Sequence, residues 1–163
     1  MKKNLPNFLI VGAAKCGTSS LHNYLNQHPD IFMPSFNTDG VNVKEPQFLI
    51  KNKVKDRLHF GIWLWEEYKS LFEGSEKYKA VGESTVFYLY YYQEAIQEIK
   101  NRLGDDVRII IMLRNPIDRA YSAYHHVYKS LKEQHQFEYA LKIEEGRLEK
   151  DLTLTPMVMY KAM

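Results

Sequence analysis

The stretch "FLIVGAAKCGTSSLHNYL", residues 8–25, joins a short apolar run to a glycine-containing turn and the start of a helix. Gly12 and Gly17 have the spacing of the GxxxxGK[ST] loop that binds nucleotide phosphates. Thr18 stands where that loop has its lysine, and a lysine comes early instead, at Lys15. The stretch alone leaves three interpretations open: a damaged triphosphate loop, an ordinary strand-to-helix turn with a solvated lysine, or a loop for another phosphate-bearing ligand.

The composition is that of a folded single domain. The chain has 163 residues, of which 45% are hydrophobic, and a formal net charge of +2. So small a charge gives no general case for nucleic acid or a membrane surface as a partner, and we expect neither. The one cysteine, Cys16, excludes an internal disulfide and offers no zinc spacing. The first apolar run is too short to span a bilayer and lacks signal-peptide features, so we expect a cytoplasmic protein.

Strands alternate with helices, which predicts an α/β fold with a doubly wound parallel sheet. The predicted strands cover residues 8–12, 79–85 and 107–113, with a short one at 41–43 inside a loop over 34–46. The predicted helices run from Thr18 to the "HPD" at 28–30, over 62–72 and 92–104, from Pro116 onward, and over 137–148. The unbroken apolar run "VRIIIML" at 107–113 favours a central strand. Ligands of such sheets bind beyond the carboxyl ends of the strands.

Polar residues follow this strongest strand directly, in "RNPIDRAYSAYHH" (residues 114–126), whose Asn-Pro pair predicts the start of a helix. Arg114 can pair with a phosphate through two parallel hydrogen bonds, and Ser122 lies further along the helix. Taken alone, Arg114 favours a surface salt bridge, and Ser122 favours a helical hydroxyl whose hydrogen bonds are satisfied within the helix. Together with the loop around Lys15 they imply one ligand with phosphate groups in two separate places, as in a donor phosphorylated on its ribose and at its 5′ end.

These motifs resemble those of sulfotransferases that use 3′-phosphoadenosine 5′-phosphosulfate. "FLIVGAAKCGTSSL" resembles the family's 5′-phosphosulfate loop, and "VRIIIMLRNPIDRAYSAYHH" resembles its 3′-phosphate motif, with Arg114 and Ser122 at the two binding positions. "HPDIFMP", "KEPQFL" and "GESTVFYL" agree in the expected order. "KEPQFL", residues 44–49, points to the branch of glycan (heparan-type) and related bacterial enzymes. The resemblance implies a P-loop-like fold.

The resemblance also implies roles for individual residues. The donor would be held by Arg114, Ser122 and the loop residues Lys15, Cys16, Gly17, Thr18, Ser19 and Ser20. Lys15 would stabilise the charge that develops on the oxygen between sulfur and the leaving phosphate. Glu45 would take the proton of the acceptor hydroxyl; its alternative is a surface glutamate beside Lys44. We expect no metal, because the transferred group carries less charge than a phosphoryl group.

Other residues compete for the acceptor side of the site. Histidines are rival bases, and His59, His125 and His126 are the candidates, although packing or solvation is the commoner use of a histidine. Glu83 and Ser84 end a predicted strand and so face the ligand crevice. For them, contact with the acceptor and structural hydrogen bonding are equally open, and His125 joins them as a candidate acceptor contact.

The resemblance stops with "TLTPMVMYKAM", residues 153–163, where the family has further helices, a strand and a segment over the adenine. We therefore expect an incomplete domain of an active sulfotransferase, acting on a glycan or small-molecule acceptor, whose exposed apolar surface favours self-association. This chain alone would bind the donor product weakly and turn over slowly or not at all. Two other functions stay open: a small-molecule kinase, and a donor-binding module without catalytic competence.

Overall fold

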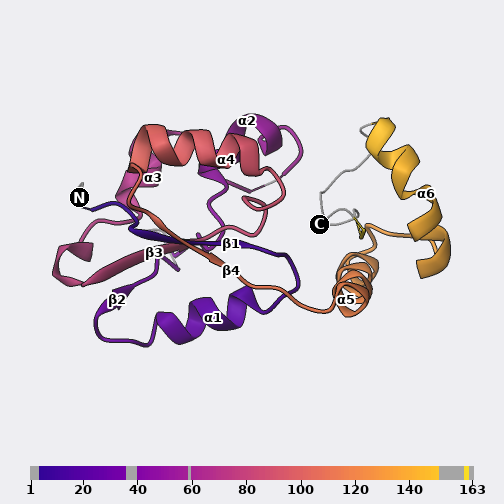
Figure 1. Cartoon of the computed structure of the whole chain (residues 1–163), viewed down its shortest axis with the longest axis horizontal. Helices are drawn as coiled ribbons and strands as arrows, with labels where there is room; N and C mark the ends of the chain where they lie inside the picture. Colours follow the sequence, from indigo (N-terminus) through magenta and orange to yellow (C-terminus); the bar gives the residue numbers. More distant parts are fainter. Residues whose placement is uncertain (1–3, 36–39, 59, 151–159, 162–163) are drawn as a thin grey trace.

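The structure, a computed structural model, describes residues 4–35, 40–58, 60–150 and 160–161. Four parallel strands form one sheet in the order β2-β3-β1-β4. Helix α1 (Thr18–Leu25) covers one face of this sheet, and α2 (Lys51–Val54), α3 (Trp65–Ser70) and α4 (Tyr92–Glu98) cover the other (Figure 1). The expected doubly wound α/β fold is confirmed. The strands are β1 (Phe8–Gly12), β2 (Ile31–Phe32), β3 (Ala80–Ser84) and β4 (Arg108–Ile111).

Strand β1 lies at the centre of the sheet and is buried along its whole length. Because successive side chains of a strand point to opposite faces, its residues join two different cores. Leu9 and Val11 belong to the larger core on the side of α2–α4. Phe8 and Ile10 belong to the smaller core, against which Leu21 of α1 packs. A continuous apolar run is what burial on both faces requires.

Strand β4 was expected at the centre of the sheet, and this prediction is wrong. In the sheet that the described residues form, β4 pairs only with β1 and lies at the edge, with Ile109 and Ile111 about half exposed. An apolar run shows that a strand tolerates burial on both faces, but it carries no information on the order of the strands. Two smaller differences concern β2, which was not predicted, and the strand expected at 41–43, which is reduced to an isolated bridge at Asn42.

The helices are α1 (Thr18–Leu25), α2 (Lys51–Val54), α3 (Trp65–Ser70), α4 (Tyr92–Glu98), α5 (Pro116–Lys129) and α6 (Phe137–Glu149), with 3-10 turns η1 (Phe48–Ile50) and η2 (Ser75–Lys77). The predicted helices are found, most of them with shorter bounds, whereas α2 was not predicted and α6 ends one residue later than predicted. Helix α4 continues as a π-helical turn, η3 (Ile99–Leu103), and ends at Gly104 with φ 110°, as the sequence predicts. Within the described ranges, no helix is long and apolar enough to cross a membrane.

Helices α5 and α6 pair with each other to one side of the sheet (Figure 1). Asn115 begins α5 as predicted, because its side chain accepts hydrogen bonds from the amides of Ile117 and Asp118. The two helices share a core of small and aromatic residues that includes Ala123, Ala140 and the buried Tyr160. This pair is therefore a separate packing unit on which part of the C-terminal segment lies.

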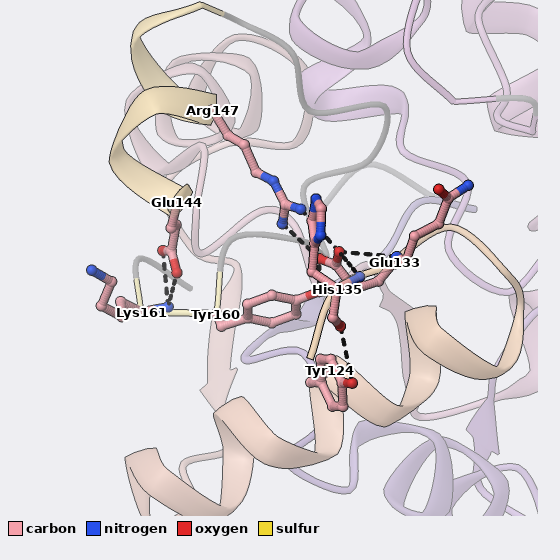
Figure 2. A network of polar contacts seen from close by, with 8 residues as sticks. Tyr124, Glu133, His135, Glu144, Arg147, Tyr160 and Lys161 are labelled. Carbon is pink, nitrogen blue, oxygen red and sulfur yellow. Dashed lines mark hydrogen bonds and ion pairs between the residues drawn. The ribbon is translucent and has the colours of Figure 1, made fainter. Parts of the chain in front are cut away.

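A buried carboxylate, Glu133, holds this unit together (Figure 2). It accepts hydrogen bonds from the Arg147 guanidinium at 2.7 and 3.0 Å and from the Tyr160 hydroxyl at 2.9 Å. Burial opposes the charge, but Arg147, the His135 amide and Tyr160 outweigh it and lower the pKa of Glu133 to about 2. Close by, Glu144 accepts a hydrogen bond from the Lys161 amide at 2.9 Å.

Candidate active site

The turn between β1 and α1 has a backbone that only certain residues allow. Gly12 has φ 144°, and a Cβ atom there would lie 2.8 Å from the carbonyl oxygen of Val86, so a side chain has neither the conformation nor the space. Gly17, the N-cap of α1, has φ 89° and no side-chain cap hydrogen bond. Lys15 between them has φ 66°. The first amides of α1 have no intrahelical acceptor, so the turn presents hydrogen-bond donors and the positive end of the helix dipole.

Backbone hydrogen bonds bring the other motifs to the same edge of the sheet. The Ala13 amide donates to the Met112 carbonyl at 2.9 Å, and the Met112 amide donates to Gly12 at 2.8 Å. The segment that leads to Arg114 therefore runs beside the loop. On the other side of β1, the Thr85 amide donates to Ile10 at 3.0 Å.

A cavity of about 460 Å³ lies where these segments meet. The loop and the start of α1 contribute Lys15, Thr18 and Ser19, a separate loop contributes Glu45, and α5 contributes Ser122. The structure thus brings together six of the predicted site residues, Gly17 included, from three distant parts of the chain. The complete lining is Ala14, Lys15, Gly17, Thr18, Ser19, Glu45, Val86, Phe87, Ser122 and His126.

Three predicted donor-binding residues lie outside this lining. Arg114 is exposed just beyond β4, and Ser20 is exposed on α1. Cys16 is half-buried, and its thiol points to the Ala14 carbonyl at 3.8 Å. Their roles stay predictions, and for Arg114 the prediction still rests on its place beside the loop.

Glu45 forms an ion pair with its neighbour Lys44, with Nζ and Oε1 2.6 Å apart. Its backbone has φ 66°, in the left-handed region that non-glycine residues rarely adopt. The Pro46 carbonyl that follows accepts a hydrogen bond from the Ile62 amide at 2.8 Å. Glu45 lines the cavity and also pairs with Lys44, as the alternative of a glutamate beside Lys44 expects, so its role as the base stays a prediction.

Glu83 and Ser84, candidate acceptor contacts, are buried and do not line the cavity. Ser84 Oγ lies 2.9 Å from Nδ1 of the buried His22, whose Nε2 is 3.2 Å from Ser35 Oγ. Burial, helped by the charge of Lys44, lowers the pKa of His22 to about 4, so this imidazole is neutral. The buried positions of Glu83 and Ser84 favour structural hydrogen bonding, the second of the two interpretations that the sequence left open.

Among the histidines, His126 lines the cavity, whereas His125 does not. His125 packs edge-on against Tyr121, with ring centroids 4.3 Å apart. Burial and the nearby Lys15 and Lys132 lower the pKa of His126, with Glu45 acting in the opposite direction. The signal for His126 is its spacing: it follows Ser122 by four residues and so lies on the same side of the helix. His59 lies outside the described residues.

The donor set fits an anionic ligand. Lys15, Thr18 and Ser19 line the cavity at the N-terminus of α1, and Ser122 lines it from α5. The part of the chain that the structure describes holds no group of three or more His, Cys, Asp or Glu residues arranged to bind a metal ion.

Comparison with known proteins identifies the family. The family described as "Sulfotransferase domain" matches residues 5–159. A solved sulfotransferase from Alicyclobacillus acidocaldarius is 39% identical, with a TM-score of 0.80, and the match covers 97% of this chain and 63% of that one. The membrane-associated sulfotransferase kil1 of Dictyostelium discoideum is 30% identical over 131 residues, which is 78% of this chain and 24% of the relative.

Human bifunctional heparan sulfate N-deacetylase/N-sulfotransferase 2 is 33% identical over 123 residues, or 75% of this chain and 13% of the relative. The chain thus spans a quarter or less of these two curated relatives. The family match nevertheless extends over nearly the whole chain, and the solved relative has the same fold. The chain belongs to the sulfotransferase domain family.

Proposed function

We propose that the protein moves a sulfuryl group from 3′-phosphoadenosine 5′-phosphosulfate to an acceptor hydroxyl. The observation that carries this proposal is the shared cavity, where the Lys15 ammonium and the Glu45 carboxylate lie with the loop hydroxyls and Ser122. A transfer site needs a cation for the leaving oxygen and a base for the acceptor hydroxyl. Lys15 and Glu45 both line this one open cavity.

The donor, when bound, would supply the activated sulfuryl group. The first-turn amides of α1 with Thr18 and Ser19 would hold its 5′ end, and fixing this end in line with the acceptor is a large part of catalysis. Ser122 would hold the 3′-phosphate from α5, with Arg114 beside it. Lys15 would stabilise negative charge on the leaving oxygen, and Glu45 would accept the acceptor's proton.

The acceptor class is part of the proposal. Relatives named for heparan sulfate and for carbohydrate sulfation support a glycan as the acceptor, and a relative named as a heparan sulfate glucosamine 3-O-sulfotransferase supports a hydroxyl as the acceptor group. A small-molecule hydroxyl is the other acceptor that the site allows, and we propose no metal requirement.

Calorimetry and a transfer assay together test the function. Adenosine 3′,5′-bisphosphate should bind without metal, and ATP with magnesium should not compete with it. Labelled sulfate should pass from the donor to a heparan-type oligosaccharide or a phenol, and Lys15→Ala should abolish most of this transfer. Metal-dependent ATP binding without bisphosphate binding would instead favour a kinase. Bisphosphate binding with equal transfer by wild type and Lys15→Ala would favour a binding module.

A further inference from the structure

We propose that Glu83 is a positioning residue, a buried carboxylate that holds the segment bearing Glu45 against the strand pair leading to the donor loop. The inference rests on the proposed function, in which Glu45 is the base. It deepens that function by naming what fixes the base relative to Lys15.

Glu83 lies at the junction of these parts. It is 0% exposed, on β3, and its register partner on the neighbouring strand β1 is Leu9. Three hydroxyls donate to its carboxylate. Thr85 Oγ1 reaches Oε1 at 2.6 Å, and the hydroxyls of Tyr68 and Tyr88 each reach Oε2 at 3.0 Å.

Two of these hydroxyls also hold the backbone that follows Glu45. Thr85 Oγ1 accepts from the Gln47 amide at 3.4 Å, and the Tyr88 hydroxyl accepts from the Leu49 amide at 3.3 Å. An amide N–H can only donate, so each hydroxyl must direct its own proton to Glu83. Each chain of two hydrogen bonds, from a backbone amide through a hydroxyl to Glu83, is called a relay here. The direction of both relays is therefore fixed, and together they require the Glu83 carboxylate to accept at both of its oxygens.

The third hydroxyl belongs to a ring that packs on the same segment. Tyr68 of α3 stacks on Phe48, with ring centroids 4.6 Å apart. One carboxylate thus reaches residues 47, 48 and 49 by three routes.

The segment needs such support because its backbone is strained. Glu45 has φ 66° and Gln47 has φ 61°, and conformations of this kind persist only where surrounding contacts hold them. Without the relays, the segment would relax toward ordinary φ values. Glu45 would then leave its place in the cavity, although β1 and the donor loop would keep theirs.

The charge on Glu83 gives the proposal a second readout. Burial raises the pKa of Glu83 to about 7, the three hydroxyls oppose the rise, and the charge of Glu45 adds to it. The titratable groups that face it are Tyr68 from α3, Tyr88 from the turn after β3, and Glu45, whereas β1 contributes apolar residues only. Protonation would remove an acceptor that the relays need, so activity should fall as the pH drops through about 7.

The experiment compares Glu83→Gln and Tyr88→Phe with wild type and with Tyr92→Phe, which alters an exposed tyrosine on α4. Amide hydrogen exchange in peptides covering residues 45–49 should be about tenfold faster or more in the first two variants. The reason is that the relays that hold the amides of Gln47 and Leu49 are weakened or lost. Exchange in β1 should not change. Affinity for adenosine 3′,5′-bisphosphate should stay within about twofold while kcat falls about tenfold or more. The fall in activity near pH 7 should disappear in Glu83→Gln.

A variant cycle separates positioning from general destabilisation. If Glu83 acts through Glu45, then adding Glu83→Gln to Glu45→Gln should cost no further activity. Unchanged exchange at 45–49, or an equal loss of activity in the Glu45→Gln background, would overturn the inference. If Glu83→Gln does not fold, Tyr88→Phe and Thr85→Val test the two relays separately. A wild-type chain that neither binds the bisphosphate nor transfers sulfate would overturn the proposed function instead, and the exchange data would still decide whether Glu83 holds the segment.

Discussion

Lys15 and Glu45, the two residues proposed to act on charge and proton, both have φ 66°. Left-handed backbone at residues other than glycine costs free energy and is found where structure is held for a purpose. Gln47, two residues after Glu45, has φ 61°. Among the described residues, three of the five non-glycine residues with positive φ therefore lie on the two loops that enter the cavity, and the other two are Asn4 and Leu131.

Replacing Lys15 with alanine removes the only lysine among the described residues that line the cavity. We expect kcat for sulfate transfer to fall by about 10²-fold or more, the usual effect of losing one group that stabilises transition-state charge. The first-turn amides of α1 remain, so bisphosphate affinity should change much less. Lys53→Ala, an exposed lysine on α2, is the control. A fall in affinity as large as the fall in kcat would assign Lys15 to binding alone.

The two adjacent histidines of α5 should respond differently to substitution. His126 lines the cavity near Lys15, so His126→Gln should lower kcat/KM for the acceptor by about tenfold. Since its pKa lies below the usual value, His126 is neutral at pH 7 and accepts a proton or a hydrogen bond there. His125→Gln should leave kcat/KM unchanged, because His125 packs on Tyr121. Steady-state kinetics of the two variants decides; equal effects would contradict this assignment.

At the scale of elements, the sequence predicts what is local and misses what is not. The loop between β1 and α1 and the start of α5 at Asn115 are determined by residues that are neighbours in the sequence. Both are found where they were predicted. The edge position of β4 depends on which strands pair, and no property of its own seven-residue run records that.

The site divides in the same way. Lys15 and Ser122 follow directly from motifs, and each lines the cavity. The hydrogen bonds of Glu83 join residues 68, 85 and 88 and lead to the amides of 47 and 49, so no local pattern could reveal them. His22, buried at 1% exposure and close to Ser84, was likewise hidden, because the helical pattern around it favours its apolar neighbours.

A pair of glycine substitutions tests how the β1 strand end is built. Gly12→Ala adds a Cβ atom 2.8 Å from the Val86 carbonyl at φ 144°, so we expect a loss of about 1–3 kcal/mol in the free energy of unfolding. Gly146 lies in α6 with open space around it, so Gly146→Ala should stabilise by about 0.5–1 kcal/mol. Urea denaturation measures both. If Gly12→Ala did not lower the free energy of unfolding relative to Gly146→Ala, the clash at Gly12 would be relieved by movement of the turn.

At the scale of the whole molecule, the cavity lies between two packing units. The sheet and its helices provide Lys15 and Glu45, and the α5–α6 unit provides Ser122 and His126. The contacts that stabilise the α5–α6 unit should therefore affect the affinity for the donor. Glu133, which ties Arg147 and Tyr160 to the turn after α5, is the central contact of that unit (Figure 2).

Glu133 gives the α5–α6 unit a predicted sensitivity to acid. Its pKa is lowered from 4.5 to about 2, so the folded state favours the charged form. The stabilisation is fully present above pH 4.5 and is lost as the pH falls toward 2, because the unfolded chain takes up the proton first. In Glu133→Gln, this contribution to the pH dependence of the free energy of unfolding between pH 4.5 and 2 should be absent. At pH 7 the free energy of unfolding of the variant should be about 3 kcal/mol lower than that of the wild type, because Arg147 is left without its charged partner.

Unfolding by urea between pH 7 and 2.5 measures this, with Glu138→Gln, an exposed glutamate in the first turn of α6, as the control. The control should keep the acid sensitivity of the wild type. Because Ser122 lies on α5, bisphosphate affinity should fall in Glu133→Gln and not in Glu138→Gln. If Glu133→Gln keeps the wild-type affinity despite its lost stability, the α5–α6 unit holds Ser122 in place without the Glu133 contacts. The donor site would then depend on α5 alone.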